Sequence, residues 1–465
     1  LSSKPFAYSL REERLKYITG FSGSAGYAVI TSNDLKINEE NIEINQDNTE
    51  NGIVVDRDCA VFVDGRYVVQ VKEQIDSDIF QDFDLAKVKP AKWISSVMPK
   101  NSTVGIDINC VSYKEYISIK NELGMNNINL VATENNLVDK IWTDKPASVI
   151  SEISIFPDEY NGCPSPQKRQ LIAQTLRDKD LDATVICDPE SICWLLNIRG
   201  KDRAYLPVIN CKMVAYSNEA LEWYINPNQF KDENLQDQLQ EHIGHIDIFP
   251  EEAFDDVLDR LCSSSCTVYV DPETTNAHVM TKLYSGGAKV SEGLGLCQMP
   301  KACKNHIEVA GEYKAHIKDG IAMCRFISWL DNLTALDKPT DSDETFLRRV
   351  EGVDEAELAA RALSFRKVEA GFIEPSFATI SALGPNAAMC HYNHENEATP
   401  RALGKDCLYL IDSGAHFIEG TTDITRTILV GPHITDEIKR MYTLVLKSHI
   451  ALATLIFPKG TSGIQ

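Results

Sequence analysis

The chain has 465 residues, which is too long for one compact core and predicts two to four domains. Its 46 Lys and Arg residues face 68 Asp and Glu residues, and the resulting formal net charge of -22 disfavours binding to nucleic-acid phosphates or to anionic membrane surfaces. Hydrophobic residues make up 43% and charged residues 25%, a composition that excludes a largely disordered chain.

Apolar runs and cysteines predict the compartment. No stretch of the chain approaches the roughly 18 to 20 uninterrupted apolar residues of a membrane span. The thirteen cysteines are an odd number and lie mostly within apolar runs, where a reduced thiol packs as a small hydrophobic group. Because reduced thiols persist in a reducing compartment, the sequence predicts a cytoplasmic protein.

The first 300 residues predict two α/β domains in tandem, joined near residues 142–146. Short Val- and Ile-rich runs separated by Gly and Asn/Asp turns indicate strands, and helical segments follow them. The plan repeats from about Pro166, and the segments RLKYITGFSG and SICWLLNIRG indicate a weak internal duplication. Within the first domain, the Asn- and Glu-rich stretch Ser32 to Asn51 predicts a surface insertion.

The pattern changes after about Lys301. A long helical segment places five residues on one apolar stripe: Ile317, Ile321, Cys324, Ile327 and Leu330. A second helix follows in DEAELAARALSFRKVEA, and then strands in SFATISAL, CLYLID and TRTILV. Helices followed by antiparallel strands predict an α+β domain.

The segment CLYLIDSGAHFIEGTTDITRTILV carries two candidate metal ligands. Asp412 ends one apolar run, a loop from Ser413 to Gly420 follows, and Asp423 opens the next run. If the runs pair antiparallel, the two carboxylates lie close together on one face. Like charges so placed repel unless a proton or a cation lies between them, and oxygen ligands suit Mn²⁺, Mg²⁺ or Ca²⁺. Alternatively, both aspartates cap turns beside glycine.

Three other features are open on spacing alone. His391 emerges from a loop after a Gly-Pro-Asn turn and could move protons or hold a substrate carbonyl, and His394 lies close by as an alternative. Arg66 begins a helix after a turn, a usual position for a solvated charge. The glycines of GFSGSAG do not match the dinucleotide-binding fingerprint and indicate tight turns.

Taken together, seven segments resemble cytosolic X-prolyl aminopeptidases (aminopeptidase P), of the pita-bread metallopeptidase group. In chain order they cover nearly the whole sequence: YITGFSGSAGYAVIT, VDGRYVVQ, NLVDKIWTDKP, WLLNIRG, AHIKDGIAMC, GPNAAMCHY and LIDSGAHFIEGTTDITRT. The resemblance implies two creatinase-N-like α/β domains, expected at 1–146 and 147–300. A pita-bread catalytic domain is expected at 301–465.

The resemblance also implies the chemistry. Asp412 and Asp423 match two metal-binding aspartates, with Asp423 bridging two Mn²⁺ ions per subunit. His391 matches a histidine that contacts substrate near the scissile bond, and Arg66 matches an arginine of the first domain that binds peptide. The implied activity is release of the N-terminal residue from peptides with proline second, by a homodimer. Proline lacks the amide N–H that ordinary peptidases bind, so a dedicated enzyme is needed.

The family's other ligands, a histidine and two glutamates, have no recognisable match here. We therefore expect the sequence to be part of a longer protein, to begin inside it at Leu1, and to stop before its catalytic domain is complete. By itself the 465-residue chain is expected to be inactive and to bind Mn²⁺ weakly. Two alternatives are a non-catalytic pita-bread module that binds peptide or histone tails, and a prolidase that cleaves dipeptides.

Overall fold

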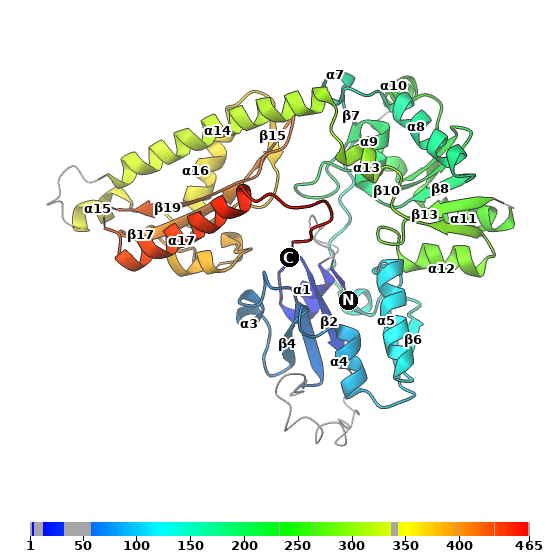
Figure 1. Ribbon diagram of the computed structural model, residues 1–465, viewed down its shortest axis with the longest axis horizontal. Helices are drawn as coiled ribbons and strands as arrows, with labels where there is room; N and C mark the ends of the chain where they lie inside the picture. The colour runs from blue at the N-terminus through cyan, green and yellow to red at the C-terminus, as the bar shows by residue number, and fades with distance from the viewer. Residues whose placement is uncertain are drawn as a thin grey trace.

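A computed structural model describes residues 2–3, 13–31, 57–231, 233–264, 266–335, 343–397, 399–431 and 433–463. The polar stretch Ser32 to Asn51, predicted as an insertion, lies outside them. Figure 1 shows three groups of elements, with the first domain below, the second at the right, and the third at the left under the long helix α14. Within the described residues, no helix is long and apolar enough to cross a membrane.

The first domain is built around strand β3 (Cys59–Val63), whose two faces are both covered. Val61 and Val63 pack with Tyr67, while Ala60 and Phe62 pack against helix α4 (Pro90–Val97) on the other face. β3 is antiparallel to β2 and parallel to β4. The remaining elements of this domain are as follows: β1 (Ser2–Ser3), α1 (Arg14–Thr19), β2 (Gly26–Ile30), α3 (Gln70–Gln74), β4 (Phe80–Asp84), β5 (Thr103–Ile106), α5 (Tyr113–Met125), β6 (Asn129–Ala132) and α6 (Leu137–Ile141).

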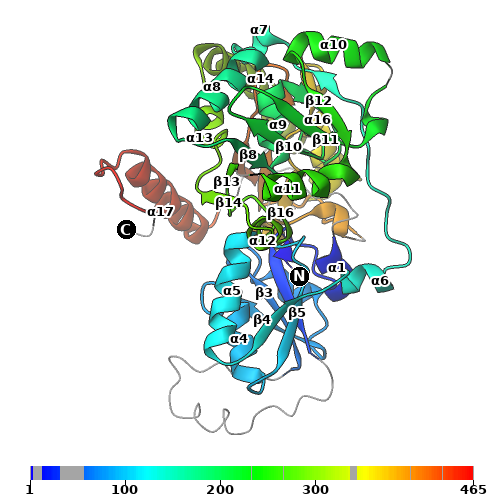
Figure 2. The same ribbon diagram turned by 90° about the vertical axis from the view of Figure 1, so that its right-hand side faces the viewer.

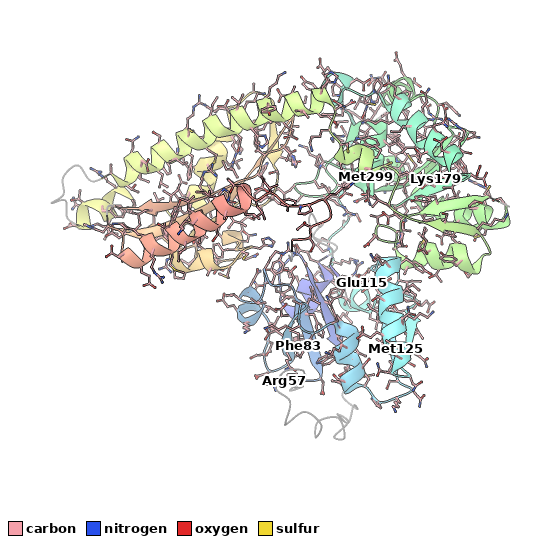
Figure 3. The ribbon with its side chains drawn as sticks, viewed as in Figure 1. Arg57, Phe83, Glu115, Met125, Lys179 and Met299 are labelled. Atoms are coloured by element: carbon pink, nitrogen blue, oxygen red, sulfur yellow. The ribbon has the colours of Figure 1, made fainter. Side chains whose placement is uncertain are left out.

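Helix α5 is attached to this sheet by a polar contact as well as by apolar packing. Glu115 lies on the side of α5 that faces the strands (Figure 3), and the hydroxyl of Tyr27 on β2 donates a hydrogen bond to it. The opposite end of α5 carries Met125, which is exposed. Helix α5 thus buries one side, with Tyr116 and Leu123, and exposes the rest, as an amphipathic helix does.

The second domain is a six-stranded sheet in the order β12-β11-β10-β8-β13-β14, with helices on both faces (Figure 2). Along β10, Met213 and Ala215 pack into one core while Val214 packs into the other. The elements of this domain are as follows: β7 (Ser154–Ile155), α7 (Asp158–Asn161), α8 (Ser165–Asp178), β8 (Ala183–Ile186), α9 (Pro189–Leu196), β9 (Ile198–Arg199), β10 (Cys211–Tyr216), β11 (Leu221–Ile225), η3 (Pro227–Gln229), α10 (Glu233–Ile243), β12 (Asp247–Pro250), η4 (Glu251–Ala253), α11 (Phe254–Ser263), β13 (Thr267–Val270), α12 (Ala277–Ser285), β14 (Lys289–Glu292) and α13 (Gln298–Ala302).

The third domain packs helices α14, α15 and α16 against one face of the sheet β16-β17-β19. Tyr409 and Ile411 of β17 point into the core with Phe326 and Leu358, and the other face carries Asp412. The elements are as follows: α14 (His306–Thr334), α15 (Asp343–Arg349), α16 (Glu355–Lys367), β15 (Phe372–Pro375), β16 (Ile380–Leu383), η5 (Gly384–Ala388), η6 (His394–Asn396), β17 (Cys407–Ser413), β18 (Ala415–Phe417), β19 (Ile424–Val430) and α17 (Asp436–Ala453).

The apolar stripe predicted on α14 coincides with its buried face only at the C-terminal end. Leu330 is buried and Ile327 packs against the core, but Ile317 and Ile321 are 63% and 42% exposed, and Cys324 is exposed as well. The rest of the buried face runs through other residues: Ala315, Asp319, Ala322, Met323 and Phe326. The prediction was wrong for the first three residues because the buried face contains a charged residue, Asp319, that a hydrophobic pattern assigns to solvent.

Asp319 is buried because it forms an ion pair with Arg366 of α16. The two side chains are 3% and 2% exposed, and the Nε of Arg366 donates to Asp319 Oδ1 over 2.5 Å. Arg366 also donates to the carbonyl oxygen of Ser413, the residue after Asp412. This pair therefore joins both helices to the end of β17 that carries Asp412.

Replacing Asp319 by Asn should destabilise the third domain. The change leaves the Arg366 guanidinium buried without a counter-charge, and loss of one partner of a buried pair typically costs about 3–5 kcal/mol of unfolding free energy. Hydrogen exchange of α14 and α16, followed as a function of urea, measures this loss. The matched control is Glu357→Gln, which removes an exposed pair with Arg361 and should cost at most about 0.5 kcal/mol. Equal effects of the two changes would contradict the prediction.

Candidate active site

Asp412 and Asp423 lie on the sheet face that the helices leave uncovered. β17 and β19 pair antiparallel as expected, with Asp412 opposite Thr425, and Asp423 immediately precedes β19. Ile424 and Ile428 pack toward the helices. Because side chains alternate along a strand, Asp423 and Thr425 turn to the face of Asp412. The carboxylate of Asp423 lies close enough to raise the pKa of Asp412.

The surroundings of Asp412 suit a cation. Its Oδ1 atom is buried and has no hydrogen-bond partner in the described part of the molecule. Burial raises the pKa of Asp412, a hydrogen bond from Thr425 opposes that rise, and the nearby charge of Asp423 adds to it. A cation between the carboxylates would satisfy the open oxygen and relieve the repulsion. Among the described residues, no third His, Cys, Asp or Glu joins these two in a group suited to a metal.

The loop that carries His391 is held by one buried carboxylate, Glu355. This side chain is fully buried at the start of α16, and four groups donate hydrogen bonds to it: the backbone N–H groups of Leu383 and Arg401, the amide of Asn386 and the hydroxyl of Tyr392. Tyr392 also packs with Ile380, the strand neighbour of Asp412. The residue next to His391 is thereby fixed beside the strand pair of the two aspartates.

Sequence reasoning missed Glu355. An acidic residue in the first turn of a helix ordinarily faces solvent and interacts with the helix dipole. The available signal was weak, because Glu355 is one of several acidic residues in VDEAELAAR. Its partners lie up to 46 residues further along the chain, so no local pattern connects them to it.

His391 contacts the first domain. Its Nδ1 lies 2.5 Å from the hydroxyl oxygen of Tyr67, and the two rings meet edge to face with centroids 5.0 Å apart. Burial lowers the pKa of His391, the positive charge of Arg66 lowers it further, and Asp64 opposes both effects. Both of the larger effects favour the neutral imidazole of His391. The alternative, His394, is buried, with an Nδ1 atom that lacks a hydrogen-bond partner in the described residues.

Arg66 lies in a turn, and helix α3 begins four residues later, at Gln70. Asp64 accepts two hydrogen bonds from the Arg66 guanidinium, at 2.9 and 2.5 Å, and this pairing raises the pKa of Arg66 and lowers that of Asp64. The guanidinium lies 5.4 Å from the centre of the Tyr67 ring. The turn thus brings a partly exposed cation to the contact between Tyr67 and His391.

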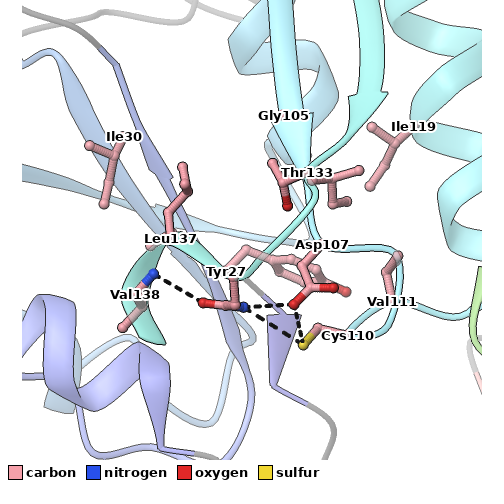
Figure 4. Close-up of a pocket in the computed structure, with 13 residues that line it drawn as sticks. Tyr27, Ile30, Gly105, Asp107, Cys110, Val111, Ile119, Thr133, Leu137 and Val138 are labelled. Atoms are coloured by element: carbon pink, nitrogen blue, oxygen red, sulfur yellow. Dashed lines mark hydrogen bonds between the residues drawn. The ribbon is translucent and has the colours of Figure 1, made fainter. Parts of the chain in front are cut away.

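Two cavities lie away from these residues, since none of the four predicted site residues lines either one. One, of about 820 Å³, separates the second domain from β15 and β18. The other, of about 180 Å³, lies inside the first domain (Figure 4). There Asp107 accepts hydrogen bonds from Asn136 and Cys110, and burial raises the pKa of the Cys110 thiol to about 11. This smaller cavity is lined by a hydrogen-bonded carboxylate and a thiol whose raised pKa favours the protonated form.

Replacing Asp412 by Asn should stabilise the metal-free protein. The change removes a desolvated charge that Asp423 repels, while the amide oxygen can still accept the hydrogen bond from Thr425. We expect a gain of about 0.5–1 kcal/mol in unfolding free energy, the usual result of removing strain at a functional site. Thermal melts in the presence of a chelator measure it, with the exposed Asp331→Asn as control. A destabilised Asp412→Asn protein would contradict the repulsion inferred here.

Comparison with known proteins matches the whole length of the chain. The Creatinase/Prolidase N-terminal domain family matches residues 5–141 and, in a second model, residues 144–308. The Metallopeptidase family M24 model matches residues 310–465. The two tandem domains and the metallopeptidase domain predicted from the sequence are thereby confirmed.

Relatives of known name cover nearly all of the chain. It is 30% identical over 456 residues to the Xaa-Pro aminopeptidase ApepP of Drosophila melanogaster, covering 97% of this chain and 67% of that protein. It is 32% identical to a probable Xaa-Pro aminopeptidase P of Talaromyces marneffei, covering 97% of this chain and 64% of that one. The chain thus spans about two thirds of the length of these relatives.

The fold has a solved counterpart. An X-prolyl aminopeptidase from Caenorhabditis elegans, described as a cytosolic enzyme with a di-nuclear active site, superposes with a TM-score of 0.84 at 26% identity. The match covers all of this chain and 70% of that one. The arrangement of the three domains in Figure 1 is therefore that of a known enzyme architecture.

Proposed function

Because this chain belongs to the family of Xaa-Pro aminopeptidases, we propose that the protein is a metallopeptidase that removes the N-terminal residue from peptides with proline second. The observation that carries the proposal is the buried, unpartnered Oδ1 of Asp412 beside Asp423. A partly buried carboxylate beside a second carboxylate is costly in a protein that binds no cation, and in a protein that binds one it supplies a ligand.

Asp412 and Asp423 are proposed to hold divalent cations, Mn²⁺ in the first instance and two per subunit. Their donor chemistry fits, because hard carboxylate oxygens suit Mn²⁺ and the buried Oδ1 is available to accept it. When bound, such ions lower the pKa of water and polarise the scissile carbonyl. The carboxylates of Asp412 and Asp423 would hold and orient them.

His391 and Arg66 are proposed to act on the peptide. A neutral His391 can donate a hydrogen bond to the carbonyl oxygen on which charge develops, without adding a second cation beside Arg66. Arg66 keeps donor groups for a peptide carbonyl or carboxylate, because Asp64 occupies only one edge of its guanidinium. The first domain would thus complete a site whose reacting residues lie in the third.

Several further properties are part of the same proposal. The protein is proposed to be a cytoplasmic homodimer, in keeping with the cytosolic relative and with the cysteine usage. Domain boundaries at 1–146, 147–300 and 301–465 stay predictions.

Replacing Asp412 or Asp423 by Ala in the whole protein should abolish hydrolysis of an X-Pro-Y tripeptide and lower the bound manganese. Each carboxylate supplies oxygens that the remaining one cannot replace. Elemental analysis and turnover measure the two effects. Unchanged metal in both variants would reject them as ligands, and turnover of X-Pro dipeptides alone would indicate a prolidase. Tripeptide binding without turnover in the unsubstituted protein would indicate a non-catalytic module.

Replacing His391 by Ala should separate substrate chemistry from metal binding. We expect kcat to fall by roughly 10²- to 10⁴-fold, the range for a positioned proton-transfer or hydrogen-bonding group, while metal content stays normal. His394→Ala is the paired variant and should retain most of the turnover if it folds normally. A large loss of metal from the His391 variant would instead make this histidine a ligand.

A further inference from the structure

We propose that Tyr67 of the first domain is a positioning residue that holds His391 as the neutral tautomer with its proton on Nε2. The inference rests on the proposed function for its catalytic meaning, but the hydrogen bonds that carry it stand without that function. Tyr67 and His391 are 324 residues apart in the chain, and the contact joins two domains.

The donors and acceptors around the Tyr67 hydroxyl determine the tautomer. Ser24 donates its backbone N–H to the Tyr67 oxygen over 3.2 Å, and its own hydroxyl lies within hydrogen-bond distance of the same atom. If Ser24 uses both donors, the two lone pairs of the phenol oxygen are filled. The single proton of Tyr67 then points to the remaining partner, His391 Nδ1.

The opposite arrangement is chemically poorer. It requires His391 Nδ1 to donate to a phenol oxygen that already accepts from the Ser24 N–H, and it sends the Tyr67 proton to the Ser24 hydroxyl. A phenol is the better donor and an unprotonated imidazole nitrogen the better acceptor, so the bond from Tyr67 to Nδ1 is favoured. With Nδ1 as acceptor, neutral His391 carries its proton on Nε2.

Tyr67 can impose this geometry because it is fixed on all sides. It is fully buried, and its ring packs edge to face on Phe21 with centroids 5.5 Å apart. The His391 ring contacts another edge of it. A buried aromatic ring between two perpendicular neighbours cannot rotate out of the contact without opening a cavity.

The glycine-rich loop GFSGSAG also helps to hold Tyr67, because it carries Ser24. At Gly23 an added Cβ would lie 2.1 Å from the Phe21 ring, so only glycine lets the loop fold back onto that ring and bring Ser24 to Tyr67. Ser22 bonds to Gln74 of α3, and Asn396, from the segment after His391, donates to the Ser22 hydroxyl over 3.2 Å. The loop therefore contacts the third domain directly at Ser22, and it reaches His391 through Tyr67.

The tautomer determines the direction in which His391 can donate a hydrogen bond. His391 offers one N–H, and with Nδ1 occupied by Tyr67 that N–H is on Nε2, on the side of the ring away from the Tyr67 hydroxyl. The packing of the adjacent Tyr392 beside Ile380, the strand neighbour of Asp412, places the segment next to the carboxylate pair. A histidine free to exchange tautomers would present a lone pair for part of the time, and a lone pair cannot stabilise charge on a carbonyl oxygen.

Nitrogen NMR of protein labelled in the histidine rings tests the inference directly. His391→Asn identifies the His391 signals by their loss. In the unsubstituted protein we expect Nδ1 to be the unprotonated nitrogen and Nε2 the protonated one. In Tyr67→Phe, which keeps the ring and removes the hydroxyl, we expect the two nitrogens to shift toward a tautomeric mixture.

We expect kcat to fall when Tyr67 no longer fixes the tautomer of His391. We expect Tyr67→Phe to lower kcat about 10- to 100-fold, as loss of a group that orients another typically does, with KM and metal content little changed. Asn396→Ala removes the hydrogen bond from the third domain to Ser22 of the loop without touching His391, and it should leave both the NMR signals and kcat unchanged. Tyr224→Phe, in the second domain, controls for loss of a buried tyrosine hydroxyl.

The outcomes separate this inference from the proposed function. A protonated Nδ1 in the unsubstituted protein would overturn the inference even if the enzyme cleaves X-Pro peptides. Equal losses of kcat in Tyr67→Phe and Asn396→Ala would also overturn it, because docking of the domains alone would then explain both. The expected NMR shift in a protein without peptidase activity would support the positioning of His391 and reject the proposed function.

Discussion

The pairing register of β17 is the constraint on which the third domain depends. One face of this strand must supply Tyr409 and Ile411 to the core formed with α14 and α16, while the other must carry Asp412 beside Asp423. Because side chains alternate with a period of two, a slip of one residue would bury the carboxylate among helices and expose the aromatic ring. The register that stabilises the core therefore also places the carboxylate of Asp412 beside Asp423.

A buried ion pair and a buried carboxylate hold the ends of this arrangement. The Asp319–Arg366 pair reaches the carbonyl of Ser413, and Glu355 gathers four donors around the loop that carries His391. None of these charges has access to water, so each must have its partners in place. Such fully satisfied polar groups are sensitive to geometry in a way that apolar packing is not, and they set the positions of β17 and the loop relative to each other.

The sequence predicted the features of the site that depend on local alternation and missed those that depend on distant partners. The antiparallel hairpin with Asp412 and Asp423 follows from two apolar runs and the turn between them. The loop from Ser413 to Gly420 was predicted without structure, yet it contains β18, which pairs with β15 and so needs a partner some 40 residues away. Tyr67 and Glu355 have no local signal either, because a buried tyrosine after Arg66 and an acidic residue in a first helical turn are common.

The two α/β domains share a similar helix end, but its polar groups bind different partners in each. In each, a short helix ends at a residue in the left-handed conformation, Gly20 in the first domain and Asn197 in the second, at matching places in RLKYITGFSG and SICWLLNIRG. In the second domain the polar groups at this end are used internally, since Asn197 accepts from Lys168 and donates to Asp158.

In the first domain the corresponding residue is Gly20, which has no side chain to form hydrogen bonds like those of Asn197. The chain that follows it turns outward instead, and its serines bond to Tyr67 and to Asn396 of the third domain. The repeated helix end is thus a site of internal capping in one copy and of contact between domains in the other. The asparagine of the second domain does not fit at position 20, because an added Cβ there would lie 2.9 Å from the carbonyl oxygen of Gln74.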